Sequence, residues 1–257
     1  MATFTRAIFR NSNVTLLEFY DIIEEAKTLH NLDDAHATEL GKTLAFAQYL
    51  CSFYKSEKDT LSVTVMLEEG KIVVVGKGDF TLKGYIDQLN LEQDLQGAII
   101  VIKGENLKKP YTGTCFFTQG QQEGFVNYFD KSEQNELHVD IKIDIKNKYA
   151  KAVFSQFLPG ATNEDMLAKD KLFIELDNEN LYEYFMENSQ VLSTENFYYQ
   201  CDCSVDRIER AILALGLAEA REIIKEQGKI EIKCEFCQKI YSYNGEQIEK
   251  LFKETND

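Results

Sequence analysis

The stretch Cys201-Asp202-Cys203 and, 30 residues further on, the stretch Cys234-Glu235-Phe236-Cys237 decide the fold of the C-terminal quarter. Two close pairs of thiols separated by a short insert supply the four sulfur ligands of a tetrahedral zinc site. Such a closed site leaves no coordination position for water or substrate, so it stabilises structure and catalyses no hydrolysis. We therefore predict one zinc ion, bound by Cys201, Cys203, Cys234 and Cys237.

The residues around these cysteines predict a small module over residues 201–257. Ser204 is a good N-cap for a first helix, and Gly216 is a natural stop for it. The remaining predicted elements are a helix over Leu217–Gln227, two paired strands over Lys229–Lys233 and Ile240–Tyr243, and a closing helix over Glu246–Phe252. So few apolar residues make a thin core, and a module of this size needs a metal or another staple to fold.

Zinc-bound thiolates remain oxidisable, and closing each close pair into a disulfide would expel the metal. One hypothesis is therefore a zinc clip that doubles as a redox sensor. A second is a permanent clip that never responds to oxidant. A third is a thiol–disulfide oxidoreductase that uses Cys234 and Cys237, which is disfavoured because the pair follows a helical insert instead of opening a helix in a βαβ unit.

Residues 161–200 differ from their neighbours in composition. They include nine acidic residues and two lysines, and so carry −7 of the net charge of −15, yet seven of them are aromatic. Repulsion among like charges weakens a compact state, whereas aromatic surface packs where its neighbours permit. We expect a metastable, helical, acidic linker. An acidic helical linker that never opens remains the alternative.

Residues 1–160 are predicted to form an α/β core domain. Apolar residues at helical spacing predict helices over Thr15–His30, Asp33–Tyr54 and Gln121–Gln134. Runs typical of strands, several of them alternating between apolar and polar residues, are Leu61–Leu67, Ile72–Val75, Ala98–Ile102, Thr114–Phe117 and His138–Ile145. The expected fold class is α+β, with an N-terminal mixed sheet packed with helices, a helical acidic linker and a small C-terminal four-cysteine zinc module.

The charge of the chain excludes two classes of partner, and its apolar stretches indicate its compartment. With 43 acidic residues against 28 basic ones, it lacks the excess of Lys and Arg that binding to nucleic acid or to an anionic membrane requires. No signal-peptide core opens the sequence, and no apolar stretch reaches the length of a membrane span. We expect a cytoplasmic protein, in which paired cysteines indicate metal binding or redox activity.

The other candidate sites are weak. Cys51 and Cys115 lie in apolar stretches without a neighbouring cysteine, so each is expected to be a buried, inert thiol. Gly76-Lys77-Gly78 is a bare GxG without the rest of a nucleotide-binding motif, and a turn between strands explains it. No zinc-protease, hydrolase or kinase motif is present. We therefore expect a protein that is not an enzyme.

The sequence resembles the heat shock protein 33 family of redox-regulated, ATP-independent holdase chaperones, and the resemblance covers essentially the whole chain. The C-terminal part, with both cysteine pairs, is the most specific. The matching segments are Leu40-Gly41-Lys42-Thr43-Leu44, Pro110-Tyr111-Thr112-Gly113, Tyr128 to Gln134, Leu158-Pro159-Gly160-Ala161, Cys201-Asp202-Cys203-Ser204, Leu213 to Gly216, Gly228-Lys229-Ile230-Glu231, Cys234 to Cys237, and Tyr241.

This resemblance implies a mechanism. Reduced and zinc-bound, a member of that family is inactive; oxidative stress forms disulfides that correspond here to Cys201/Cys203 and Cys234/Cys237. Zinc is then released, the linker unfolds, and the protein binds unfolding client proteins and prevents their aggregation. The family also implies a monomer when reduced and a homodimer when oxidised. A static zinc-stabilised interaction or regulatory module, without redox switching, is the alternative function.

Overall fold

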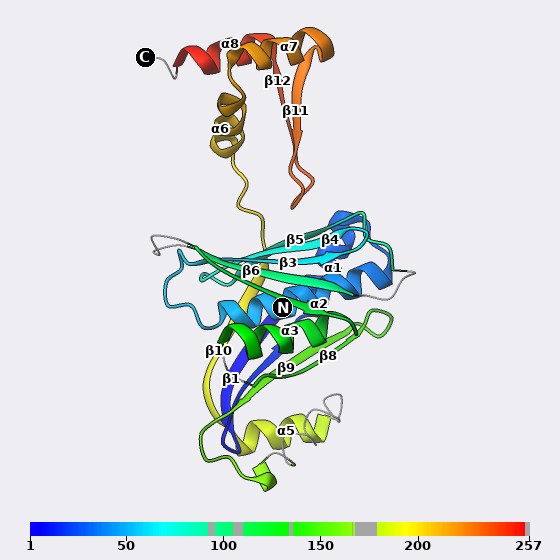
Figure 1. Ribbon diagram of the computed structural model, residues 1–257, viewed down its shortest axis with the longest axis vertical. Coiled ribbons are helices and arrows are strands. Elements are labelled where there is room, and N and C mark those ends of the chain that lie inside the picture. Colours follow the sequence, from blue (N-terminus) through cyan, green and yellow to red (C-terminus); the bar gives the residue numbers. More distant parts are fainter. Residues whose placement is uncertain (92–95, 105–109, 134–135, 166, 168–178, 255–257) are drawn as a thin grey trace. The chain divides into compact units, whose positions relative to one another are not determined.

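The computed structural model describes residues 1–91, 96–104, 110–133, 136–165, 167 and 179–254. The chain divides into two compact units, Met1–Gln200 and Cys201–Asp257 (Figure 1). This boundary coincides with the predicted start of the cysteine module. The predicted division into a core domain over 1–160 and a linker over 161–200 stays a prediction.

Ten strands in the described part of the first unit form one mixed sheet, in the order β7-β6-β3-β4-β5-β10-β1-β2-β9-β8. Neighbouring strands are antiparallel except β10 and β5, which are parallel. The strands are β1 (Ala2–Phe9), β2 (Ser12–Glu18), β3 (Thr60–Leu67), β4 (Lys71–Lys77), β5 (Thr81–Asp87), β6 (Gly97–Gly104), β7 (Tyr111–Phe117), β8 (His138–Asp144), β9 (Tyr149–Phe157) and β10 (Gln190–Tyr199).

The helices α1 (Tyr20–His30), α2 (Asp34–Cys51) and α3 (Gln121–Tyr128) lie between the two halves of this curved sheet (Figure 1). Helix α2 is the centre of the core, since 13 of its 18 residues are buried. Phe46 of α2 stacks on Phe125 of α3 at 4.1 Å between ring centroids, and Tyr49 stacks on Phe154 of β9 at 4.3 Å. The long apolar run in the sequence of α2 therefore reflects contacts on several sides.

The five strands predicted in the first unit are present as β3, β4, β6, β7 and β8. The helix predicted over Thr15–His30 is wrong at its start, because β2 runs to Glu18 and α1 begins at Tyr20. Leu16 packs in one cluster of buried residues and Leu17 in another, on opposite faces of β2. A strand buried on both faces reads as a continuous apolar run, which helical spacing also fits.

The predicted helix over Gln121–Gln134 is divided. Helix α3 ends at Tyr128, and Phe129–Glu133 form one turn of π-helix. Gln134 lies outside the described residues.

The acidic segment 161–200 contains both a helix and a strand. Helix α5 (Glu179–Asn188) agrees with the predicted helical character, whereas Gln190–Tyr199 form β10, paired with β1 and β5. The aromatic residues Phe197 and Tyr199 are buried, which gives β10 a buried face and explains why it joins the sheet. Residues 166 and 168–178 of the predicted linker lie outside the described residues.

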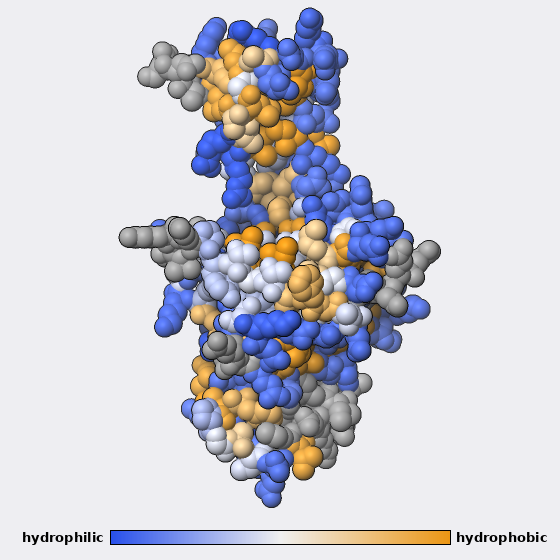
Figure 2. Space-filling view, viewed as in Figure 1, coloured by the Kyte–Doolittle hydropathy of each residue, from blue (hydrophilic) through white to orange (hydrophobic). Residues whose placement is uncertain are grey.

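Helix α5 is attached through a small satellite cluster. Phe185 of α5 is buried against Ala7, Phe9, Val14, Leu16 and Val153, with its ring centroid 5.4 Å from that of Phe9. Arg10 donates a hydrogen bond to the hydroxyl of Tyr184 at 3.3 Å. Hydrophobic residues also gather on the surface around α5 (Figure 2).

The second unit consists of α6 (Val205–Leu215), α7 (Leu217–Gln227), the antiparallel hairpin of β11 (Lys229–Lys233) and β12 (Ile240–Asn244), and α8 (Gly245–Glu254). Every predicted element of the module is present within about two residues of its predicted ends. Its described core is seven buried residues, Ile208, Ile212, Ala220, Ile230, Tyr241, Tyr243 and Ile248. Among the helices in the described ranges, none is long and apolar enough to cross a membrane.

Candidate metal centre

The four paired cysteines lie on two loops of the second unit. Cys201 and Cys203 precede α6, whose N-cap Ser204 accepts a hydrogen bond from the backbone N–H of Arg207, as predicted. Cys234 and Cys237 lie in the turn between β11 and β12. Two backbone hydrogen bonds close this turn, from the N–H of Cys234 to the carbonyl of Lys239 and from the N–H of Gln238 to the carbonyl of Cys234.

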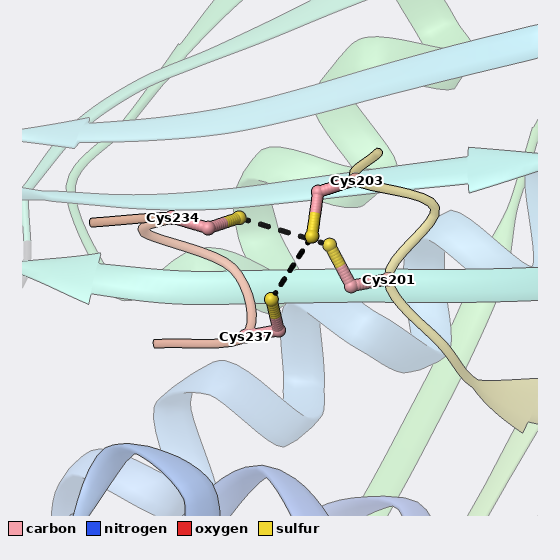
Figure 3. Close-up of side chains that lie close together, drawn as sticks. All are labelled: Cys201, Cys203, Cys234 and Cys237. Carbon is pink, nitrogen blue, oxygen red and sulfur yellow. Dashed lines mark hydrogen bonds between the residues drawn. The ribbon is translucent and has the colours of Figure 1, made fainter. Parts of the chain in front are cut away.

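The four side chains point toward one another (Figure 3), and all their Sγ atoms lie within 4.8 Å. The Sγ atoms of Cys201 and Cys234 are 3.8 Å apart, and those of Cys203 and Cys237 are 3.2 Å apart. A tetrahedral site with Zn–S bonds of about 2.3 Å has sulfur–sulfur edges of about 3.8 Å. The cluster therefore has the ligand type and the size that such an ion requires, and all four cysteines are free thiols.

The pKa values within the cluster diverge. Burial and hydrogen bonding with the neighbouring thiols raise the pKa of Cys201 to about 12, and burial also raises the pKa of Cys237. At Cys203 burial acts in the same direction, but hydrogen bonds with Tyr241 and Cys237 outweigh it and lower its pKa to about 7. Among these three thiols, protein groups favour the thiolate only at Cys203, whereas a divalent cation would favour the ionised form of each sulfur that it binds.

One residue beyond the cysteines contributes directly to the site. The hydroxyl of Tyr241 on β12 lies 3.2 Å from Sγ of Cys203, and the ring of Tyr241 is buried in the core of the module. Lys239 lies over this ring, with Nζ 5.0 Å from its centroid. Sequence reasoning assigned Tyr241 no role at the site; its position in the hairpin, with a side chain facing inward, was the available signal.

The remaining cysteines take no part in this cluster. Cys51 in α2 and Cys115 in β7 are buried in the core of the first unit, and burial raises the pKa of each thiol. Cys115 donates a hydrogen bond to the carbonyl of Gly124 at 3.1 Å. Both match the prediction of buried thiols. Gly76-Lys77-Gly78 was predicted as a turn between strands, but Gly76 and Lys77 belong to the end of β4 and only Gly78 lies in the turn that follows.

Comparison with known proteins agrees with this arrangement. The family described as "Hsp33 protein" matches residues 3–244. The 33 kDa chaperonin of Alkaliphilus metalliredigens is 29% identical over 97% of this chain and 98% of its own length. That of Lactobacillus johnsonii is 28% identical over 98% of both chains.

The likeness extends to a solved structure. The crystal structure of the 33 kDa chaperonin (heat shock protein 33 homolog) from Thermotoga maritima superimposes with a TM-score of 0.80, covering 100% of this chain and 99% of that one at 22% identity. This match concerns the fold, whereas the match to the family extends over nearly the whole sequence. The chain therefore belongs to the Hsp33 family, a family of chaperones that hold client proteins without catalysing a reaction.

Proposed function

We propose that this chain is a redox-regulated, ATP-independent holdase. In the reduced state Cys201, Cys203, Cys234 and Cys237 hold one zinc ion, and the protein is inactive. Oxidative stress forms two disulfides, Cys201/Cys203 and Cys234/Cys237, which releases the zinc and unfolds the linker over 161–200. The oxidised protein then binds unfolding client proteins and prevents their aggregation.

The observation that carries this proposal is a cluster of four Sγ atoms within 4.8 Å inside a module whose described core has seven buried residues. A bound metal ties the two cysteine loops together, and its binding free energy adds to the folding free energy of the module. Each disulfide forms when two thiols lose two protons and two electrons to peroxide, which is reduced to two water molecules. Since disulfide sulfur is no longer a thiolate ligand, the same reaction removes that stabilisation.

Chain connectivity supports the coupling to the linker. Cys201 follows two residues after Tyr199, the last residue of β10. The Tyr199 hydroxyl donates to the carbonyl of Gly84 at 2.5 Å and accepts from its N–H at 3.2 Å. Upstream, α5 is attached through a cluster of six buried residues. Upstream of β10, so small an apolar attachment within a segment of net charge −7 leaves α5 with little to keep it folded.

The proposal predicts its partners and its compartment. Clients are unfolding proteins, bound through apolar surface, and the strong negative charge of the chain keeps the complexes in solution. The oxidised form is a homodimer, and neither nucleic acid nor a membrane is a partner. The protein works in the cytoplasm, where thiols are reduced until stress oxidises them.

The decisive test compares the reduced and the peroxide-treated protein. Each form is incubated with a thermally unfolding client while light scattering reports aggregation, and a colorimetric reagent measures released zinc against the number of free thiols. We expect one zinc per reduced chain, its release together with the loss of four thiols, and protection of the client by the oxidised form alone. Equal protection by both forms with zinc retained would refute the switch.

A ligand variant tests the coupling separately. Cys234→Ser should lower the zinc affinity and leave the linker sensitive to protease even in reductant, because the module loses one of its four sulfur ligands. Cys115→Ser is the matched control, since this thiol lies in the core of the first unit. A linker in Cys234→Ser that resists protease as well as in the wild type would contradict the coupling.

The alternative is a static zinc-stabilised interaction or regulatory module. It shares the metal site but predicts a protease pattern that oxidant leaves unchanged. The same comparison of reduced and oxidised protein therefore separates the two functions.

A further inference from the structure

The two edge strands of the ten-stranded sheet, β7 and β8, differ in how they are protected. An edge strand has main-chain N–H and C=O groups that no strand satisfies on its outer side, so it is a template for another extended chain. Natural sheets protect such edges with charged side chains, proline or bulges. The composition of an edge strand therefore indicates whether the sheet excludes or admits a further strand.

Strand β8 has the protected kind of edge. Its sequence His-Val-Asp-Ile-Lys-Ile-Asp places Asp140, Lys142 and Asp144 at every second position. An incoming strand would have to bury these charges beside its own side chains, which costs free energy unless each charge finds a partner.

Strand β7 has the opposite composition. Its seven residues, Tyr-Thr-Gly-Thr-Cys-Phe-Phe, include no charge and no proline. Tyr111, Thr112, Thr114 and Phe116 are exposed, whereas the alternate residues Gly113, Cys115 and Phe117 are buried. Threonine and aromatic residues are also those that favour strand pairing. Nothing in this composition opposes the addition of a strand.

One side chain forms a hydrogen bond with the main chain of β7. Asn127 of α3 donates a hydrogen bond to the carbonyl of Phe116 at 2.9 Å. Within the described residues, this is the one side-chain hydrogen bond to the backbone of β7 beyond its ladder with β6.

An apolar row continues inward from the exposed side of β7. Phe116 is 69% exposed and lies opposite Ala98 of β6, which in turn lies opposite Met66 of β3, itself 40% exposed. A strand added at β7 would place alternate side chains at the end of this row, next to Phe116. The chemistry of the edge therefore fits an uncharged, extended segment with apolar side chains.

We propose that β7 is a docking edge on which an unfolded client adds an extended, uncharged segment as an eleventh strand. This inference rests on the proposed holdase function and names the form in which a client is bound. Main-chain pairing does not depend on the client's sequence, which suits a chaperone with many clients. A single added strand is weakly bound by itself, so the edge fixes the register of the client while apolar surface freed on activation supplies affinity.

Amide hydrogen exchange tests the edge directly. The oxidised full chain is compared alone and with a permanently unfolded probe, a reduced and carboxymethylated protein. We expect alternate amides of β7 to exchange about tenfold more slowly with the probe, and those of β8 to be unchanged. Unchanged β7 exchange while the probe is bound would overturn the proposal. The proposal would also be overturned if the β7 amides of the oxidised chain alone already exchanged as slowly as they do with the probe. A second copy of the chain would then occupy the edge.

A pair of variants separates the edge from the face beside it. Thr114→Lys places a charge on β7, whereas Ile102→Lys places the same charge on the interior strand β6, at a side chain that is 39% exposed. We expect Thr114→Lys to weaken probe binding by about fivefold and Ile102→Lys to change it by less than about twofold. Equal losses would mean that the client lies on the face, against the proposal.

This experiment also keeps the two proposals apart. Zinc release and thiol loss on oxidation should be the same in both variants, since neither residue lies in the second unit. An oxidised wild type that fails to suppress aggregation contradicts the holdase function. If the β7 amides still exchanged more slowly with the unfolded probe, that result would support strand addition at β7 without the holdase function.

Discussion

The two units of this protein have hydrophobic cores of very different size. In the described part of the first unit, the main core alone contains 37 buried hydrophobic residues, centred on α2. The second unit has a core of seven and, beside it, four thiols within 4.8 Å of one another. A core of the first size stands on the hydrophobic effect, whereas a module of the second size requires a staple. We therefore expect the first unit to be stable through its core alone, and the second to depend on a metal ion held by its four thiols.

Metal removal should give the largest difference in stability between the two units. A chelator applied to the reduced protein should unfold residues 201–257, because structural zinc supplies about 10 kcal/mol or more of folding free energy in small modules. The first unit should keep its slowly exchanging amides. Hydrogen exchange resolved by peptide measures both regions at once. A module that stays protected without metal would contradict the distinction between the units.

The converse change weakens the first unit alone. Phe46→Ala removes a ring that stacks on Phe125 and contacts Tyr128 and Phe129, and should cost about 3–5 kcal/mol of unfolding free energy. Denaturant titration followed by circular dichroism gives the loss. Zinc per chain should remain at the wild-type value, and a fall in zinc content would indicate that the units depend on one another.

A smaller effect is expected beside the ligands. Tyr241→Phe keeps the ring in the core but removes the hydroxyl that lies 3.2 Å from Sγ of Cys203. Loss of such a partner lowers metal affinity by about tenfold. Competition with a chromophoric chelator measures the affinity, and Tyr243→Phe is a suitable control because Tyr243 lies in the same core. Equal affinity in the two variants would remove Tyr241 from the site.

The smallest expected effect is at the cap of α6. Ser204→Ala removes the acceptor for the N–H of Arg207 and should cost about 1 kcal/mol, which is a large share of the stability of a thin core. The effect should appear as faster exchange in residues 205–215 and as a lower midpoint of module unfolding. Ser204→Asp, which keeps an N-cap acceptor, should restore the wild-type value.

Prediction from sequence succeeded best where structure is local. Ser204, Gly216 and Gly228 delimit α6 and α7, and the residues that begin and end these helices are adjacent to them in the sequence. In the first unit, β1, β2, β5, β9 and β10 were not predicted as strands. β2 is buried on both faces, so it lacks the alternation that identifies a strand with one buried face.

The sequence predicted which four cysteines form the candidate site, but not the contacts that the surrounding residues make with them. The spacing of the four cysteines was enough to group them, because two short-spaced cysteine pairs in one sequence are typical of a zinc site. The contact of Tyr241 with Cys203, and the opposite pKa shifts of Cys201 and Cys203, follow from packing in three dimensions. The sequence indicated only that Tyr241 faces inward in the predicted hairpin, and not which cysteine it contacts.

The sequence by itself determined the cysteine cluster, the local elements of the small unit, the family and the acidic character of residues 161–200. Only the tertiary structure decided that Gln190–Tyr199 form a strand between β1 and β5, and that β7 and β8 become the edges of one sheet. Caps and metal ligands act over a few residues or through a distinctive atom type, so they are visible in the sequence. Strand pairing joins residues far apart through main-chain groups that every residue has, so its partners are decided by the folded whole.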